Sequence, residues 1–177
     1  MLVSGAGTNL QALLDERLPV VAVASNAAGA VALERAERAG VPTAAFELGD
    51  YPDRNARDAA MAAWLEEQGV GLVVCAGYMH LLRPCFLARF PGRVVNVHPA
   101  LLPAFPGAHA VEDALAAGVA ETGASVHLVD EGVDTGRVLR QEPVAVCPGD
   151  TAETLHARIR EAEHRLLPAV VRELIEA

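Results

Sequence analysis

The chain has 177 residues, of which 52% are hydrophobic; this is enough apolar material for one substantial core without disulfides or metal, so we expect a single domain. Its 23 acidic side chains outnumber its 14 basic ones, and the formal net charge of −9 argues against a nucleic-acid partner. All the basic residues are arginines, which excludes a Walker-type phosphate loop and Schiff-base chemistry because each needs a lysine amine.

The first half of the sequence alternates short β-rich runs with stretches of helical period. Such alternation is typical of an α/β fold with a Rossmann-like, mostly parallel sheet flanked by helices. We predict strands over Leu2–Ser4, Val20–Ser25, Thr43–Phe46, Gly71–Ala76 and Arg93–His98, and helices over Thr8–Glu16, Ala30–Ala39, Arg54–Glu67 and Pro84–Phe90.

The pattern changes after the strand that ends at His98. The two extended runs predicted there flank a short turn at residues 131–136, so we expect them to pair as a late antiparallel extension of the sheet. The predicted elements are a helix over Ala108–Ala117, the runs Ala124–Asp130 and Arg137–Val146, and a closing helix from Thr151.

No apolar run reaches the roughly 18–20 residues that cross a bilayer. The segment Met1–Gly7 enters a glycine turn too soon to hold a signal peptide, so we expect a cytoplasmic protein without a membrane partner. Cys75, Cys85 and Cys147 are odd in number and form no CxxC pair, so we expect reduced thiols. No pattern indicates the oligomeric state.

The segment Ser4–Asn9 follows a predicted strand and opens a predicted helix, and it reads Ser-Gly-Ala-Gly-Thr-Asn. A glycine turn at a helix start exposes N–H groups at the positive end of the helix dipole, which suits a phosphate. The spacing is not Gly-x-Gly-x-x-Gly, and Ser25-Asn26 replaces the acid expected after the second strand, so we expect no dinucleotide. A tight turn N-capped by Thr8 explains the hexapeptide equally well.

Asn96 and His98 close a predicted strand, and residues two apart on a strand point to the same face. The carboxyl end of a strand is where open α/β sheets bind their ligands. The loop that follows, Pro99–Gly107, is apolar and contains three prolines, so it is stiff enough to fix the geometry around His98. For Asn-x-His alone, a polar pair satisfied by loop backbone is the commoner arrangement.

Asp134 lies between the two late extended runs, in a Val-Asp-Thr-Gly segment that most often means turn chemistry. A carboxylate delivered onto an imidazole would instead favour its charged form and hold its orientation. The remaining histidines show no metal-ligand spacing, so we expect no metal. A structural role is slightly favoured for His127 in mid-strand, and we expect His156 and His164 on a solvated helix face.

Several segments together resemble the folate-dependent formyltransferase family, nearly end to end. Each motif is weak alone, but the combination is highly specific. The matching segments are Ser-Gly-x-Gly-Thr-Asn-Leu-Gln at 4–11, Ala-Gly-Tyr-Met at 76–79, Asn-Val-His-Pro-x-Leu-Leu-Pro at 96–103, Gly-x-Ser-Val-His at 123–127, Asp-x-Gly at 134–136 and Glu-His at 163–164.

The resemblance implies transfer of a formyl group from the co-substrate 10-formyltetrahydrofolate to the amine of glycinamide ribonucleotide, in purine biosynthesis. It implies one formyltransferase domain over 1–177, with a phosphate-binding N-terminal half and a folate-binding C-terminal half. Asn96, His98 and Asp134 match the catalytic positions. The positions matched to the ribonucleotide are Gly7, Thr8, Asn9, Pro99 and Glu163, and those matched to folate are Arg54, Tyr78, Met79, Leu82, Val97, Val129 and Asp130, the last two within the loop up to Asp134.

The resemblance also implies a cis peptide at Leu102–Pro103. His80 and Ala104 stand where basic residues are common in the family, which leaves the details of the anion contacts open.

Three other functions, two of them enzymatic, are compatible with parts of the pattern. A formyltetrahydrofolate hydrolase uses the same three residues with water as acceptor, although such relatives usually add an N-terminal regulatory domain that these 177 residues do not include. A methionyl-tRNA formyltransferase adds an RNA-binding domain, and the acidic charge here opposes tRNA. A non-catalytic phosphate-binding α/β protein would not need Asn96, His98 and Asp134 together.

Overall fold

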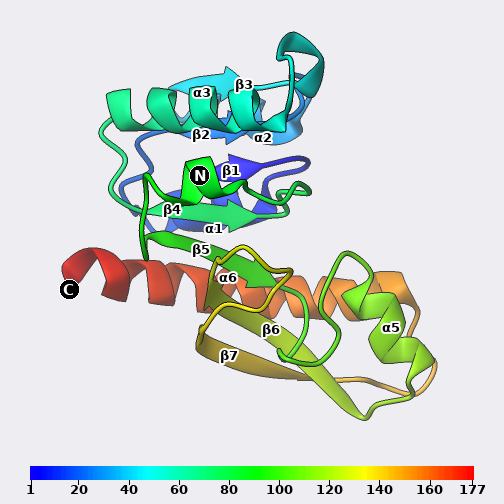
Figure 1. Cartoon of the computed structure of the whole chain (residues 1–177). Coiled ribbons are helices and arrows are strands. Elements are labelled where there is room, and N and C mark those ends of the chain that lie inside the picture. Colours follow the sequence, from blue (N-terminus) through cyan, green and yellow to red (C-terminus); the bar gives the residue numbers. More distant parts are fainter. The chain divides into compact units, whose positions relative to one another are not determined.

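Strands and helices alternate through the first half of the chain, as the sequence predicts (Figure 1). The computed structural model describes all 177 residues, which divide into two compact units, Met1–Val95 (unit 1) and Asn96–Ala177 (unit 2). The seven strands follow the order β3-β2-β1-β4-β5-β6-β7. None of the helices combines the length and the apolar character that crossing a membrane requires.

Unit 1 is a parallel β-sheet with helical connections. Its strands β1, β2 and β4 are buried Val-, Ala- and Leu-rich runs, the composition expected when both faces of a parallel strand are covered. The elements are β1 (Leu2–Val3), α1 (Thr8–Asp15), β2 (Val23–Ser25), α2 (Val31–Arg38), β3 (Thr43–Ala45), a 3₁₀ turn η1 (Leu48–Asp50), α3 (Arg54–Glu67), β4 (Val73–Ala76) and α4 (Pro84–Leu87).

From β1 the chain adds β2 and then β3 on one side, and it then crosses back to add β4 on the other side of β1. Because crossovers between parallel strands are right-handed, α1 and α2 lie on one face of the sheet and α3 lies on the other. Contacts agree with this placement, because α1 packs against α2 whereas α3 packs against α4. The register aligns Val3 with Ser25 and Leu2 with Cys75, so the carboxyl ends of β1, β2 and β4 lie at one edge of the unit.

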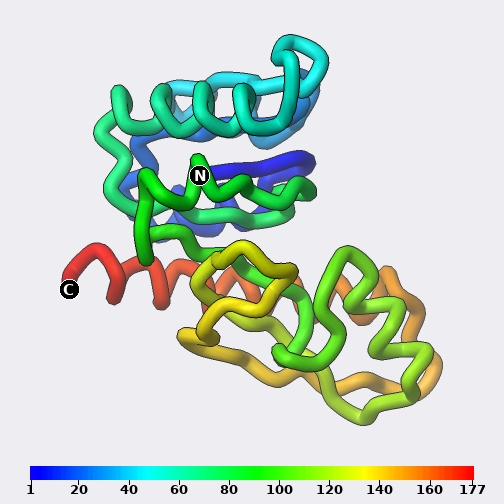
Figure 2. Tube along the Cα trace, viewed as in Figure 1, coloured from blue at the N-terminus to red at the C-terminus, as the bar shows by residue number.

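Unit 2 contains the antiparallel pair predicted from the late extended runs. Strand β6 pairs antiparallel with β7, from Glu121 opposite Ala145 to His127 opposite Val138. The elements are β5 (Val94–His98), which begins at the end of unit 1, then α5 (Ala110–Ala116), β6 (Glu121–Leu128), β7 (Val138–Ala145) and α6 (Ala152–Glu176). The loops after β5 (green) and after β6 (yellow) are traced in Figure 2.

The predicted fold class, α/β with a mostly parallel sheet and a late antiparallel extension, is confirmed. The predicted helix Arg54–Glu67 matches α3 end to end, whereas the run Val20–Ser25 is strand only from Val23. The N-cap prediction for Thr8 is wrong: Gly7 caps α1 with φ 70°, a left-handed conformation that glycine adopts without penalty. That the whole chain is one domain stays a prediction.

A buried serine holds the loop that follows β5 in place through hydrogen bonds to its backbone. The hydroxyl of Ser125 on β6 donates to the Ala100 carbonyl at 2.6 Å and accepts from the Leu102 N–H at 3.0 Å. The amide of Gln141 donates to the same hydroxyl at 2.8 Å. The peptide bond that follows, Leu102–Pro103, is cis, which confirms the prediction.

We predict that Ser125→Ala destabilises the protein, because it leaves the buried Leu102 N–H and Ala100 carbonyl without their partner. Leaving buried polar groups unpaired costs about 1–3 kcal/mol of unfolding free energy, measurable by urea denaturation. The control is Thr43→Ala, which removes an exposed hydroxyl that bonds Glu37, and it should cost no more than roughly 0.5 kcal/mol. Equal losses for the two variants would contradict the role of Ser125.

Candidate active site

The end of β5 presents an amide and an imidazole on one face of the strand, as the two-residue spacing predicts. Asn96 is partly exposed, whereas His98 is only 4% exposed. The residue between them, Val97, is buried, and strand alternation places its side chain on the opposite face. Unit 2 therefore holds a polar pair at the carboxyl end of a buried strand.

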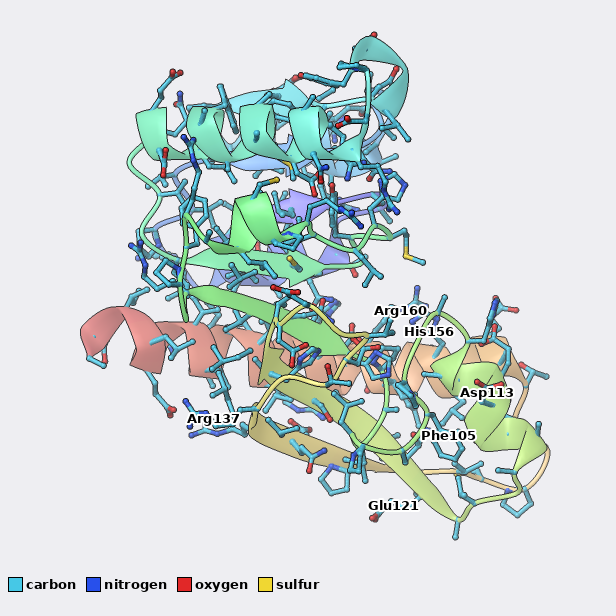
Figure 3. The ribbon with its side chains drawn as sticks, viewed as in Figure 1. Phe105, Asp113, Glu121, Arg137, His156 and Arg160 are labelled. Atoms are coloured by element: carbon cyan, nitrogen blue, oxygen red, sulfur yellow. The ribbon has the colours of Figure 1, made fainter.

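The loop after β5 supplies backbone partners to this end of the strand. Phe105, labelled in Figure 3, has φ 53°, and its carbonyl lies 2.8 Å from Nε2 of His98. A carbonyl only accepts hydrogen bonds, so Nε2 of His98 carries a proton and donates it to Phe105. The second nitrogen, Nδ1, lies 3.3 Å from Oδ2 of Asp134.

Asp134 stands between two imidazoles. Its Oδ2 faces Nδ1 of His98, and its Oδ1 lies 3.4 Å from Nε2 of His127. The Gly107 N–H also donates to Oδ2, at 2.8 Å. The backbone of Asp134 is left-handed, with φ 54°, an uncommon conformation for a non-glycine residue that often marks a functional turn. The structure therefore brings Asp134 and His98 together, as predicted.

The turn around Asp134 depends on glycine two residues later. A Cβ on Gly136 would lie 1.8 Å from the Leu128 carbonyl oxygen, so no other residue fits without moving the backbone. The loop between β6 and β7 thus folds back on the end of β6, which carries Asp134 to the histidine on that strand.

His127 is the site residue that sequence reasoning missed, because a structural role was slightly favoured. A β-bulge lies opposite this point: Val126 pairs with Arg140 and His127 pairs with Val138, so the extra residue is Leu139 of β7. A bulge disrupts the ladder locally and increases its twist, and no single-sequence pattern indicates it. The segment Gly-x-Ser-Val-His was the available signal, since it placed His127 among the motif residues.

The ring of His127 is held from both sides. Its Nδ1 donates to the Leu128 carbonyl at 2.9 Å, and its Nε2 lies 3.1 Å from the amide nitrogen of Asn96. A ring nitrogen bears a lone pair or a proton, so Nε2 accepts from Asn96 when unprotonated and donates to Asp134 when protonated. Asn96 therefore joins the cluster through His127.

The pKa of Asp134 lies below its ordinary value of 3.8. Burial acts to raise this pKa, but the hydrogen bond from His127, the Gly107 N–H and positive charge on His98 or His127 together outweigh burial. The Gly107 bond acts in either proton arrangement of His127. The site therefore holds an ionised carboxylate beside two imidazoles, which suits proton transfer and the stabilisation of developing negative charge.

The structure contains no group of three or more His, Cys, Asp or Glu side chains arranged to hold a metal ion.

A family model described as formyl transferase matches residues 1–171 of the sequence. The chain belongs to the formyltransferase family.

Named relatives lie close to this formyltransferase in both sequence and fold. A phosphoribosylglycinamide formyltransferase of Mycobacterium tuberculosis is 51% identical over 176 residues, covering 97% of this chain and 81% of the relative. The crystal structure of glycinamide ribonucleotide transformylase 1 from Symbiobacterium toebii superposes with a TM-score of 0.96 at 49% identity, covering 99% of this chain and 85% of that one. The trifunctional purine biosynthetic protein adenosine-3 of Homo sapiens is 43% identical over 97% of this chain, which spans 18% of it.

The residues that the resemblance matches to phosphate open a helix of unit 1, as expected. Gly7 is the N-cap of α1, no side chain caps the helix, and Thr8 and Asn9 are its first two residues. Asn9 is buried beneath the turn. The other two positions matched to the ribonucleotide lie in unit 2, where Pro99 follows β5 and Glu163 is a buried carboxylate on α6.

The positions matched to folate differ in exposure. In unit 1 of this formyltransferase, Met79 is exposed, Arg54 and Tyr78 are half-buried, and Leu82 is buried. In unit 2, Val97 is buried on β5, and Val129 and Asp130 follow β6 with Asp130 exposed. Asp130 makes turn contacts, accepting from the Gly132 N–H and the Thr135 hydroxyl. The assignment of these residues to folate stays a prediction.

His80, noted for replacing a basic residue, has a buried arginine as its partner. Arg57 and Asp58 of α3 have no exposed surface and form an ion pair at 2.6 Å. A second nitrogen of Arg57 donates to Nδ1 of His80 at 2.5 Å. Burial, followed by the charges of Arg57 and Arg54, lowers the pKa of His80. Sequence reasoning missed Arg57, although it lies on the buried face of α3 that includes Met61 and Leu65.

The predicted solvated positions of two histidines on α6 are only partly confirmed. His156 is exposed, and Figure 3 shows it beside Arg160 on the helix. His164 is half-buried, because it follows buried Glu163 directly and lies three residues before buried Leu167, on the same side of the helix.

We predict that Asp134→Asn changes how stability depends on pH. Because folding lowers the pKa of Asp134, its contribution to stability is present above the ordinary value of 3.8 and is lost as the pH falls through the folded value. Urea unfolding from about pH 6 down to about pH 3 should show the difference in unfolding free energy between wild type and variant shrinking towards acid. Parallel losses in the two proteins across this range would contradict the assignment.

Proposed function

We propose that the chain is a phosphoribosylglycinamide formyltransferase: it transfers the formyl group of 10-formyltetrahydrofolate to the amino group of glycinamide ribonucleotide, in the synthesis of IMP. The observation that carries the proposal is the cluster of Asn96, His98, His127 and Asp134 at the end of β5. The names of its relatives support the same reaction.

The reaction forms one bond and breaks another. The lone pair of the substrate amine attacks the formyl carbon, and the electron pair of the C=O π bond moves onto the formyl oxygen. Fixed donors aimed at that oxygen lower the barrier most. The amide of Asn96 has two N–H groups, one of which faces His127, so the other is available to the oxygen.

His98 has to exchange partners before it can act on the formyl oxygen. In the substrate-free chain its Nε2–H donates to the Phe105 carbonyl at 2.8 Å. In the reactive complex, the formyl oxygen takes the place of that carbonyl. The carboxylate of Asp134 stays beside Nδ1 of His98 during the exchange. It therefore keeps the imidazole oriented and balances the positive charge of the protonated ring.

Asp134 also takes part in the proton transfer that the reaction requires. When the bond between the formyl carbon and N10 of folate breaks, the π bond re-forms, the former amine has one proton too many, and N10 needs one. Asp134, with a bound water, accepts the proton from the attacking nitrogen and passes it to N10. The proton count balances, and neither a metal nor a covalent intermediate enters.

The remaining assignments follow the family. The turn Gly7–Asn9 of unit 1 binds the ribonucleotide phosphate through N–H groups at the positive end of α1. In the same unit Tyr78, Met79 and Leu82 contact folate, and Arg54 its glutamate tail.

We predict that turnover of 10-formyltetrahydrofolate requires glycinamide ribonucleotide, and that inorganic phosphate competes with the ribonucleotide. The measurement follows folate product with and without the acceptor, at several phosphate concentrations. Equal turnover without the ribonucleotide would replace the proposal with a formyltetrahydrofolate hydrolase, because water would then be the acceptor.

We predict that Asp134→Asn slows turnover by about 10²–10⁴-fold while both substrates still bind, because orienting and acid–base groups contribute on that order. Combined with His98→Ala, it should cost little more than the worse single change, since residues that act as one unit are not additive. Single-turnover rates of the three variants test this, with thermal melting as a check on folding. Additive losses, or near-normal turnover of Asp134→Asn, would show that the pair does not act together.

A further inference from the structure

An arginine of α2 lies against the turn Ser4–Asn9 of unit 1. Nε of Arg35 donates to the Ala6 carbonyl at 2.8 Å, and Nη1 donates to Oε1 of Gln11 at 3.2 Å. The turn packs closely on α2, because a Cβ on Gly7 would lie 2.5 Å from the Cβ of Ala32. The guanidinium thus bridges the turn to the first helix that follows it.

The bond to Ala6 fixes the direction of a neighbouring donor. In a trans peptide the C=O and the next N–H point in opposite directions, because the six atoms of the unit lie in one plane. The Ala6 carbonyl points towards Arg35, so the Gly7 N–H points away from that guanidinium. Gly7 is the N-cap of α1 and no side chain caps the helix, so the Gly7 N–H adds to the N–H groups of the first helical turn.

The charge of Arg35 has no paired carboxylate. The two groups that it contacts, the Ala6 carbonyl and the Gln11 amide, are neutral oxygens. Three residues further along α2, Arg38 is paired with Glu34 at 3.0 Å, and both side chains are well exposed. Arg35 therefore adds a net positive charge behind the turn, which favours an anion on its other side.

We propose that Arg35 is a positioning residue of the phosphate site: it holds the Ala6 carbonyl, thereby aims the Gly7 N–H, and supplies the positive charge behind the turn. The inference rests on the proposed function, in which Gly7–Asn9 binds the ribonucleotide phosphate. A merely structural Arg35 would affect stability without affecting phosphate.

The test compares Arg35→Gln with Arg38→Gln, which makes the same change of charge on the same helix. For Arg35→Gln we expect KM for the ribonucleotide, and the inhibition constant of inorganic phosphate, to rise about tenfold, because the loss of one hydrogen bond that involves a charged group changes affinity by on the order of tenfold. KM for folate and kcat at saturation should stay within about threefold, as expected when only binding is lost. Arg38→Gln should match wild type in all four constants.

Arg35→Lys keeps the charge but lacks the planar fork that reaches two acceptors, so it should give a smaller rise in the same two constants. It decides the matter if Arg35→Gln fails to fold: a lysine variant with wild-type constants overturns the inference, as does an Arg35→Gln variant that behaves like Arg38→Gln.

Calorimetric titration of each variant with inorganic phosphate separates this inference from the proposed function. If wild type binds phosphate and Arg35→Gln binds about tenfold more weakly, the inference stands even in the absence of formyl transfer. If wild type transfers the formyl group but does not bind phosphate, the inference is wrong and the activity proposal survives.

Discussion

The carboxylate of Asp134 holds the candidate site together, because it is the one group that contacts both buried imidazoles. His98 and His127 come from different strands, and each has its other ring nitrogen on a backbone carbonyl. Neither ring is therefore free to turn without losing a hydrogen bond in a buried place, which is costly. Removing the carboxylate would leave the two rings without a common partner, and nothing else would join His98 to His127 and Asn96.

The backbone conformation of unit 2 places that carboxylate beside the two imidazoles. Asp134 takes a left-handed conformation, the backbone at Gly136 leaves no room for a Cβ beside the Leu128 carbonyl, and a bulge in β7 lies opposite His127. The loop after β5 is fixed independently by Ser125, so the Gly107 N–H and the Phe105 carbonyl meet the site from a rigid segment. Rigid support of this kind is what preorganised electrostatic catalysis requires.

Much of this arrangement was predictable from local pattern. The two-residue spacing of Asn96 and His98 put both at the end of one strand, and turn residues between two extended runs predicted the antiparallel pair that brings Asp134 back. What failed depends on distant contacts. Gly7, not Thr8, caps α1, in a left-handed conformation where the turn packs on α2, and the bulge opposite His127 exists only in the paired strands. Arg35 and Arg57 act through partners far along the chain, which periodicity does not specify.

In the proposed reaction, the formyl group reacts at the cluster of Asn96, His98, His127 and Asp134. A crystal structure with glycinamide ribonucleotide and a non-reactive 10-formyltetrahydrofolate analogue tests it most directly. We expect the carbonyl oxygen of the analogue about 3 Å from Nδ2 of Asn96 and from Nε2 of His98, with the bond between His98 and Phe105 broken and Asp134 still beside His98. A carbonyl group bound away from these nitrogens, with the Phe105 bond intact, would contradict it.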